Sequence, residues 1–254
     1  MAPEYFRVTD WRTRVETLGH SVGVFGAAFV VGLVLSQIGL IAAVAAGVAE
    51  PSLENPPPSL YAAVTVLQFL GFGLVVYAYV HWWDSPDLLY LRRPSLRDLG
   101  WAGLGVVGLF AVAYAGSIII QFLGVDTATN SVVTTGRNAP LLFLYLIPVT
   151  ILLQAPMEEL LFRGVVQGLL RRAYGVVPAV LLASVMFGIG HTIALQGSLS
   201  GKLNTIVLLS GLGLVLGTVY ERSESIVVPM LVHGAWNAFL FGTQYLVASG
   251  AVQA

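Results

Sequence analysis

The chain has 254 residues, of which 57% are hydrophobic and only 10% are charged, and its formal net charge is -1. Soluble domains carry about 25% charged residues, so this composition excludes an ordinary water-soluble domain and indicates a polytopic membrane protein. The net charge is close to zero and the sequence has no stripe of basic residues, so no nucleic-acid partner is expected. The absence of cysteine excludes disulfides, thiolate zinc sites and a cysteine nucleophile.

Seven hydrophobic segments follow one another along the chain, each long enough to cross a hydrocarbon core of about 30 Å as a helix. They are Ser21–Val48, Tyr61–Trp83, Trp101–Leu123, Pro140–Leu161, Val176–Leu195, Leu203–Tyr220 and Ile226–Val247. We expect the fourth helix to continue to Leu170. The sequence therefore predicts an all-α fold, a transmembrane bundle of about seven helices within a range of six to eight.

The basic residues predict how these segments are oriented. If the N-terminus is cytoplasmic, the outer side holds only Arg137 and Lys202, whereas the cytoplasmic side holds nine arginines. The nine are Arg7, Arg12, Arg14, Arg92, Arg93, Arg97, Arg171, Arg172 and Arg222. This distribution obeys the positive-inside rule. We therefore expect an integral protein of the cell membrane with a cytoplasmic N-terminal segment, residues 1–20.

The hydrophobic segments divide into two regions by their polar content. Residues 21–123 hold three membrane helices without a motif that indicates chemistry. Residues 140–247 hold the ionisable residues that are expected deep within spans. Such residues are rare in membrane helices and are functional candidates by default. The second region is therefore the expected catalytic core.

The fourth segment places two glutamates and an arginine directly after eighteen uncharged residues, 139–156. Glu159 and Arg163 are four apart on one helix, so their side chains can meet and neutralise each other. Glu158 points about 100° away around the helix and needs a partner from another helix. We expect Pro156 to loosen or kink the helix just before the glutamates.

The fifth and seventh segments each bring one histidine. "FGIGH" places Phe187 one turn before His191, and its two glycines allow another helix to approach closely. "HGAWN" places His233 and Asn237 on one face, four residues apart. Counted from the cytoplasmic ends of their helices, Glu158 and the two histidines lie roughly 10 to 23 Å deep. We therefore expect one site near the middle of the membrane that opens towards the cytoplasm.

Three motifs in this region resemble those of a known family. "EELLFR", "FGIGH" and "HGAWN" are similar to the E-E-x-x-x-R, F-x-x-x-H and H-x-x-x-N motifs of the CAAX-protease and bacteriocin-processing intramembrane proteases, relatives of the Rce1-type prenyl-protein endopeptidase. They occur in the family's order, each on its own hydrophobic segment. The resemblance covers about residues 140–241, and it implies a membrane-anchored or prenylated C-terminal peptide or protein as the substrate, met within the lipid bilayer.

The residue types present supply what hydrolysis of an amide requires, namely an activated water, a stabilised oxyanion and a proton for the leaving amine. Glu158 is the candidate general base, and His191 can share its water. His233 and Asn237 can donate hydrogen bonds to the carbonyl oxygen as it becomes anionic. The full candidate catalytic set is Glu158, Glu159, Arg163, His191, His233 and Asn237.

A zinc mechanism would use some of the same side chains. Glu158, His191 and His233, with one water, make a donor set known from zinc hydrolases, so one Zn is a candidate cofactor. The Rce1-type resemblance instead implies a metal-free, glutamate-activated water. Because only two histidines are within reach and no H-E-x-x-H motif is present, the sequence favours the metal-free reading slightly and leaves the choice open.

Two other functions remain as alternatives. Buried glutamates and histidines also build the proton relays of ion-coupled transporters. The first three segments, however, offer no second polar layer to continue such a path. A catalytically silent membrane scaffold is the other alternative, and the presence of all six candidate residues argues against it.

Overall fold

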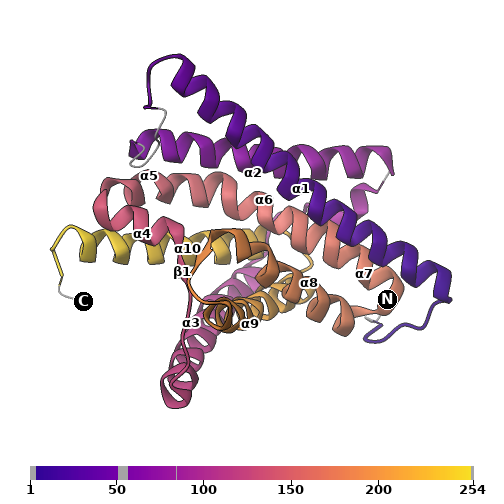
Figure 1. Cartoon of the computed structure of the whole chain (residues 1–254). Helices are drawn as coiled ribbons and strands as arrows, with labels where there is room; N and C mark the ends of the chain where they lie inside the picture. The colour runs from indigo at the N-terminus through magenta and orange to yellow at the C-terminus, as the bar shows by residue number, and fades with distance from the viewer. Residues whose placement is uncertain (1–3, 51–56, 84, 253–254) are drawn as a thin grey trace.

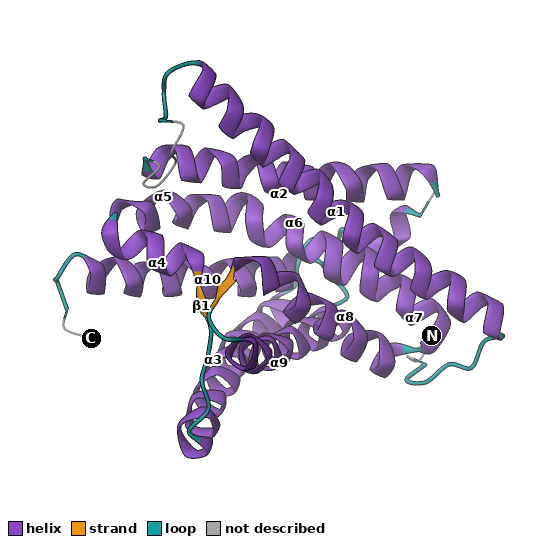
Figure 2. Ribbon diagram, viewed as in Figure 1, coloured by secondary structure: helices purple, strands orange, loops and turns teal. Residues whose placement is uncertain are grey.

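The computed structural model describes residues 4–50, 57–83 and 85–252, and helices dominate it (Figure 2). The long helices are α1 (Trp11–Ala45), α2 (Pro58–Trp82), α3 (Leu96–Leu123), α8 (Val176–Gly190), α9 (Leu199–Ser223) and α10 (Val227–Ala248). The shorter elements are the 3₁₀ helices η1 (Pro86–Leu89) and η4 (His191–Ala194), the helix α4 (Ser131–Asn138), and the paired strands β1 (Thr129–Asn130) and β2 (Leu195–Gln196). The predicted all-α class is confirmed.

A composite helix runs through the centre of the molecule. Its parts are α5 (Leu141–Val149), η2 (Thr150–Gln154), α6 (Ala155–Glu159), η3 (Leu160–Gln167) and α7 (Gly168–Tyr174). Together they form one span over Leu141–Tyr174. The prediction that the fourth helix continues past its hydrophobic segment is therefore confirmed.

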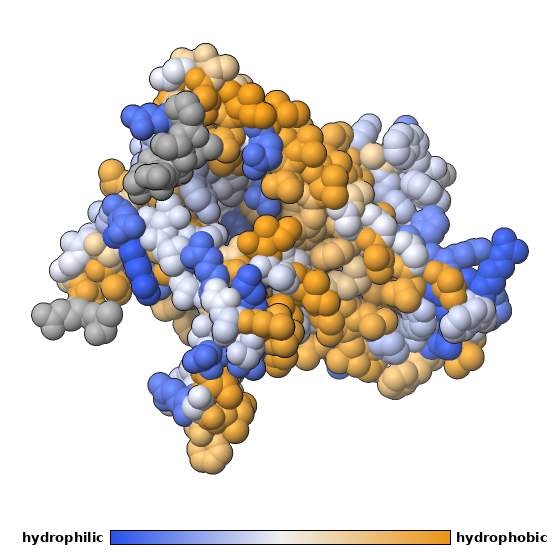
Figure 3. Space-filling view, in the orientation of Figure 1, coloured by the Kyte–Doolittle hydropathy of each residue, from blue (hydrophilic) through white to orange (hydrophobic). Residues whose placement is uncertain are grey.

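Six helices in the described ranges are long and apolar enough to cross a membrane. The seventh expected span, 226–247, is present as the 22-residue helix α10, which carries His233, Asn237 and Gln244 and is not among the six. The two ends of the chain lie at opposite ends of the bundle, as an odd number of crossings requires (Figure 1). Hydrophobic side chains cover much of the middle of the visible face, and hydrophilic ones gather towards the ends (Figure 3).

The neighbours of the composite helix hold it on several sides (Figure 1). α1 and α2 pack against each other and cover one side. α10 lies along α5 and α6, while α8 follows α7 and packs against η3 and α9. α3 contacts α9 and α10. The largest apolar cluster joins α1, α2, η3, α7 and α8, so the composite helix is the element around which the others are assembled.

The composite helix widens on both sides of the glutamates. η2 and η3 are π-helical, and α6 between them carries Glu158 and Glu159. Pro148 and Pro156 lack an N–H, so each removes a hydrogen bond to the residue four positions earlier. π-helical turns inside α-helices are frequent at functional sites. The loosening expected at Pro156 thus takes the form of widened turns.

A close approach between α8 and α9 depends on glycine. A Cβ atom on Gly188 would lie 2.3 Å from Ser210 Oγ and 2.6 Å from the backbone oxygen of Ile206. On the facing helix, a Cβ on Gly213 would lie 3.1 Å from the Cβ of Ser184. The close helix approach predicted at Gly188 is confirmed.

Gly188→Ala is expected to lower the melting temperature of the protein in detergent. The backbone of α9 must move to admit the new methyl group, which costs on the order of 1–3 kcal/mol. Gly26→Ala in α1 is the matched control, because a Cβ at Gly26 has nothing within 4 Å. Equal melting temperatures for the two variants would contradict the tight approach of α8 and α9.

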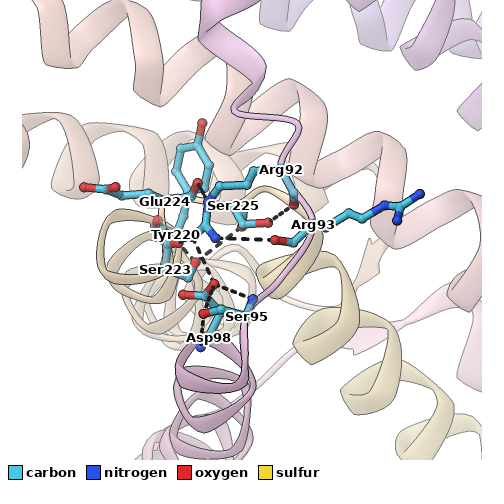
Figure 4. A network of polar contacts seen from close by, with 8 residues as sticks. All are labelled: Arg92, Arg93, Ser95, Asp98, Tyr220, Ser223, Glu224 and Ser225. Atoms are coloured by element: carbon cyan, nitrogen blue, oxygen red, sulfur yellow. Dashed lines mark hydrogen bonds and ion pairs between the residues drawn. The ribbon is translucent and has the colours of Figure 1, made fainter.

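A polar network fixes the start of α10 (Figure 4). Arg92, in the loop before α3, pairs with Asp98 at 2.9 Å and also donates to the carbonyl oxygen of Ser223 at the end of α9. Asp98 accepts from the backbone N–H of Ser95 at 2.7 Å, which caps α3. Ser225 Oγ donates to the Arg92 carbonyl at 2.6 Å. The network therefore ties α3, α9 and the turn into α10 together.

Candidate active site

The ion pair predicted within the fourth span is present and buried. Arg163 Nε donates to Glu159 Oε2 at 3.0 Å, and both side chains have an exposed fraction of 0%. The guanidinium also lies over the ring of Phe187 from α8, 5.1 Å from its centroid. Because a lone charge is costly in a membrane interior, this neutralised pair allows a second carboxylate to be placed beside it.

His233 of α10 lies between the two glutamates. Its Nδ1 donates to Glu159 Oε1 at 2.8 Å, and its Nε2 lies 3.5 Å from Glu158 Oε2. The partner from another helix that Glu158 was expected to need is therefore this histidine. Both ring nitrogens face carboxylates, so His233 joins two side chains that point away from each other on α6.

Glu158 keeps one carboxylate oxygen free of hydrogen bonds. Its Oε1 accepts from Gln154 Nε2 at 3.4 Å. Its Oε2 is buried and has no hydrogen-bond partner among the described residues. The 3.5 Å separation from His233 suits an ion pair but is too long for a good hydrogen bond. The lone pairs of Oε2 are therefore available to accept a proton.

The second histidine joins the site through Phe187. The ring of Phe187 is 4.7 Å from that of His191 and 5.7 Å from that of His233, measured between centroids. His191 Nδ1 lies 2.8 Å from the Phe187 carbonyl oxygen. A carbonyl only accepts, so Nδ1 carries the hydrogen and the Nε2 of a neutral His191 is an acceptor.

Asn237 joins the site through a residue that the sequence did not single out. Its Nδ2 donates to Thr150 Oγ1 at 3.2 Å, and Thr150 lies buried on η2. Thr150, Gln154 and Glu158 follow one another at intervals of four. This spacing could have indicated Thr150 and Gln154, which the sequence analysis did not single out.

The accessible edge of the site is formed by Gln154, His191 and Asn237, which are partly exposed, whereas Glu159 and Arg163 are buried. Each of the three lies further from the arginine-bearing end of α7 than the buried pair does. If that end is cytoplasmic, as the count of arginines predicts, the edge faces the other side of the membrane. The cytoplasmic N-terminus and the opening of the site towards the cytoplasm both stay predictions.

The zinc donor set expected from the sequence is not gathered here. In the described parts of the chain, no group of three or more His, Cys, Asp or Glu side chains is arranged to hold a metal ion. Glu158 and His233 are neighbours, whereas the ring of Phe187 lies against both His191 and His233. The described residues therefore do not fit a zinc site in this conformation.

Comparison with known proteins points to the same region of the chain. Residues 140–239 match the family model described as type II CAAX prenyl endopeptidase Rce1-like. This region is therefore similar to the Rce1-like family. The chain is also 27% identical over 181 residues to YdiL of Bacillus subtilis (strain 168), which is named as a candidate membrane peptidase, and the match covers 69% of each protein. No solved structure matches. The matched region contains the six candidate residues.

Proposed function

We propose that this protein is an intramembrane endopeptidase that hydrolyses a peptide bond of a membrane-associated polypeptide. The observation that carries the proposal is the free, buried Oε2 of Glu158, placed beside His233 inside an Rce1-like membrane region. A general base must reach the proton that it abstracts, and an oxygen without competing hydrogen bonds meets that need.

In the proposed reaction, Glu158 takes a proton from a water molecule, whose oxygen attacks the scissile carbonyl carbon. His191 accepts the other hydrogen bond of this water through Nε2. Asn237 has one Nδ2 hydrogen directed at Thr150, which leaves the other to donate to the developing oxyanion. Protonated Glu158 then returns its proton to the leaving amine, which completes the hydrolysis.

Glu159 and Arg163 act by position rather than by contact with the substrate. The Glu159 carboxylate holds His233 through Nδ1, and Arg163 pairs with that carboxylate. His233 Nε2 then lies 3.5 Å from Glu158 Oε2, beside the proposed base. The candidate catalytic groups are therefore Glu158, His191 and Asn237, with His233 beside them.

The proposed substrate class is a membrane-anchored polypeptide with a prenylated, CAAX-like C-terminus, met within the lipid bilayer. The support for this class is the description of the matched family. The test is cleavage of a farnesylated C-terminal peptide by the detergent-purified protein, compared with the same peptide without the lipid. Preferential cleavage of the farnesylated peptide supports the substrate class, and cleavage of neither peptide counts against it.

Chelation is expected to leave this cleavage unchanged, because Glu158 and not a metal activates the water. The measurement is kcat/KM for the cleaved peptide after extended dialysis against a strong zinc chelator, with and without zinc added back. A loss of activity that zinc restores would contradict the metal-free mechanism.

A further inference from the structure

A stripe of polar side chains continues from the site towards the end of α7. Glu159, Arg163, Gln167 and Arg171 follow at intervals of four, and Glu221 of α9 faces the last two. Gln167 Nε2 donates to Glu221 Oε1 at 2.8 Å, and Arg171 Nη1 pairs with Glu221 Oε2 at 3.2 Å. No candidate role assigned above requires Gln167 or Glu221.

Exposure rises steadily along this stripe. The exposed fraction of the side chain is 0% at Arg163, 10% at Glu221 and 28% at Arg171, and Gln167 is 0% exposed as a residue. From Glu159 to Arg171 the helix rises by roughly 18 Å. The stripe thus connects the buried ion pair with the surface at the end of α7, on the side of the site away from its accessible edge.

Three polar atoms of the stripe lack a protein partner. Arg163 Nη1, Arg163 Nη2 and Gln167 Oε1 are buried and have no hydrogen-bond partner among the described residues. Nearly all buried polar groups in folded proteins are hydrogen-bonded, and leaving one unpaired is costly. Two donor groups and one acceptor on neighbouring turns are the partners that buried water molecules use.

Water can both donate and accept hydrogen bonds, so it can satisfy all three atoms. Arg163 and Gln167 are fully buried, so a carboxylate of the substrate cannot reach them from the accessible edge. A purely structural role would pair these atoms with protein groups, as Gln167 Nε2 is paired with Glu221. The other face of the same helical segment, with Val165, Val166 and Leu170, lies in the apolar core and offers water no partner.

We propose that Arg163, Gln167, Glu221 and Arg171 line a water path from the surface at the end of α7 to the glutamates. This inference rests on the proposed function, because its purpose is to supply the hydrolytic water. A polypeptide bound at Gln154, His191 and Asn237 covers the accessible edge of the site. A second route on the opposite side lets water reach Glu158 while the substrate is bound.

The absence of native cysteine allows a direct test with silver ions, which travel through water and react with thiols. Gln167→Cys is compared with Leu170→Cys, a matched control that is equally buried, loses a similar side-chain volume and lies nearer the end of α7. Arg171→Cys at the mouth of the path shows that the reagent is present. Each purified full-length variant is exposed to silver nitrate, then unfolded and labelled with a maleimide.

The expected result is loss of maleimide labelling at positions 167 and 171 and full labelling at position 170. Full labelling at position 167 would overturn the path. This outcome is independent of peptidase activity, so the path and the proposed function can fail separately. If Gln167→Cys does not fold, Gln167→Leu provides a second test in an active preparation. A reduced kcat with unchanged KM and melting temperature supports the path, and an unchanged kcat overturns it.

Discussion

Replacing Glu158 with glutamine is expected to lower kcat for peptide cleavage by about 10²- to 10⁴-fold, the range that a positioned general base contributes. Glutamine retains the size of the side chain and an oxygen for the contact with Gln154, but it cannot accept the proton of water. The measurement is kcat and KM for the farnesylated peptide, with the melting temperature of both proteins recorded in the same detergent.

Glu16→Gln serves as the control for this substitution. Glu16 lies on α1, far from the site in sequence, and its side chain is largely exposed beside Arg12. It is expected to retain the activity of the parent. If Glu158→Gln cleaves as fast as Glu16→Gln, then Glu158 is not the base, and the buried carboxylates have another task.

The span positions and the local ion pair could be predicted because both depend on neighbouring residues. Hydrophobic length determined where the chain crosses the membrane, and the interval of four between Glu159 and Arg163 determined their contact. The extent of the composite helix was also predictable, since its apolar sequence continues past the glutamates. Predicting these features requires no knowledge of how the helices are arranged.

The position of His233 could not be predicted in the same way. Its bridge between Glu158 and Glu159 joins residues 74 positions apart, and it depends on how α10 lies along α6. The amides of Gln154 and Gln167 were missed for another reason. They are uncharged, so a search for ionisable residues in the spans passed over them, although their intervals of four matched the face that carries the charges.

The same polar residues explain the difference between the expected seven spans and the six that meet a hydropathy criterion. His233 and Asn237 lower the hydropathy of α10 because that helix faces the site. The expected span that is not among the six is therefore one that carries candidate site residues. The three N-terminal helices, which lack such residues, give a clear signal.

Arg163→Met is expected to destabilise the folded protein by about 3–5 kcal/mol, the cost of leaving one member of a buried ion pair without its partner. Glu159 would then remain buried with only His233 to offset its charge. The measurement is the free energy of unfolding in mixed detergent micelles. The double variant Glu159→Gln/Arg163→Met removes both charges, so it should regain much of the lost stability.

The exposed pair of Arg12 and Glu16 is the control that shows whether the loss of stability depends on burial of the ion pair. It has the same spacing and a similar separation, 2.6 Å, but its side chains are 87% and 58% exposed. Arg12→Met should therefore change stability little.

The double variant at Glu159 and Arg163 should fold yet cleave slowly, because His233 loses the carboxylate that orients it towards Glu158. A double variant with the full activity of the parent would show that the buried pair serves stability alone.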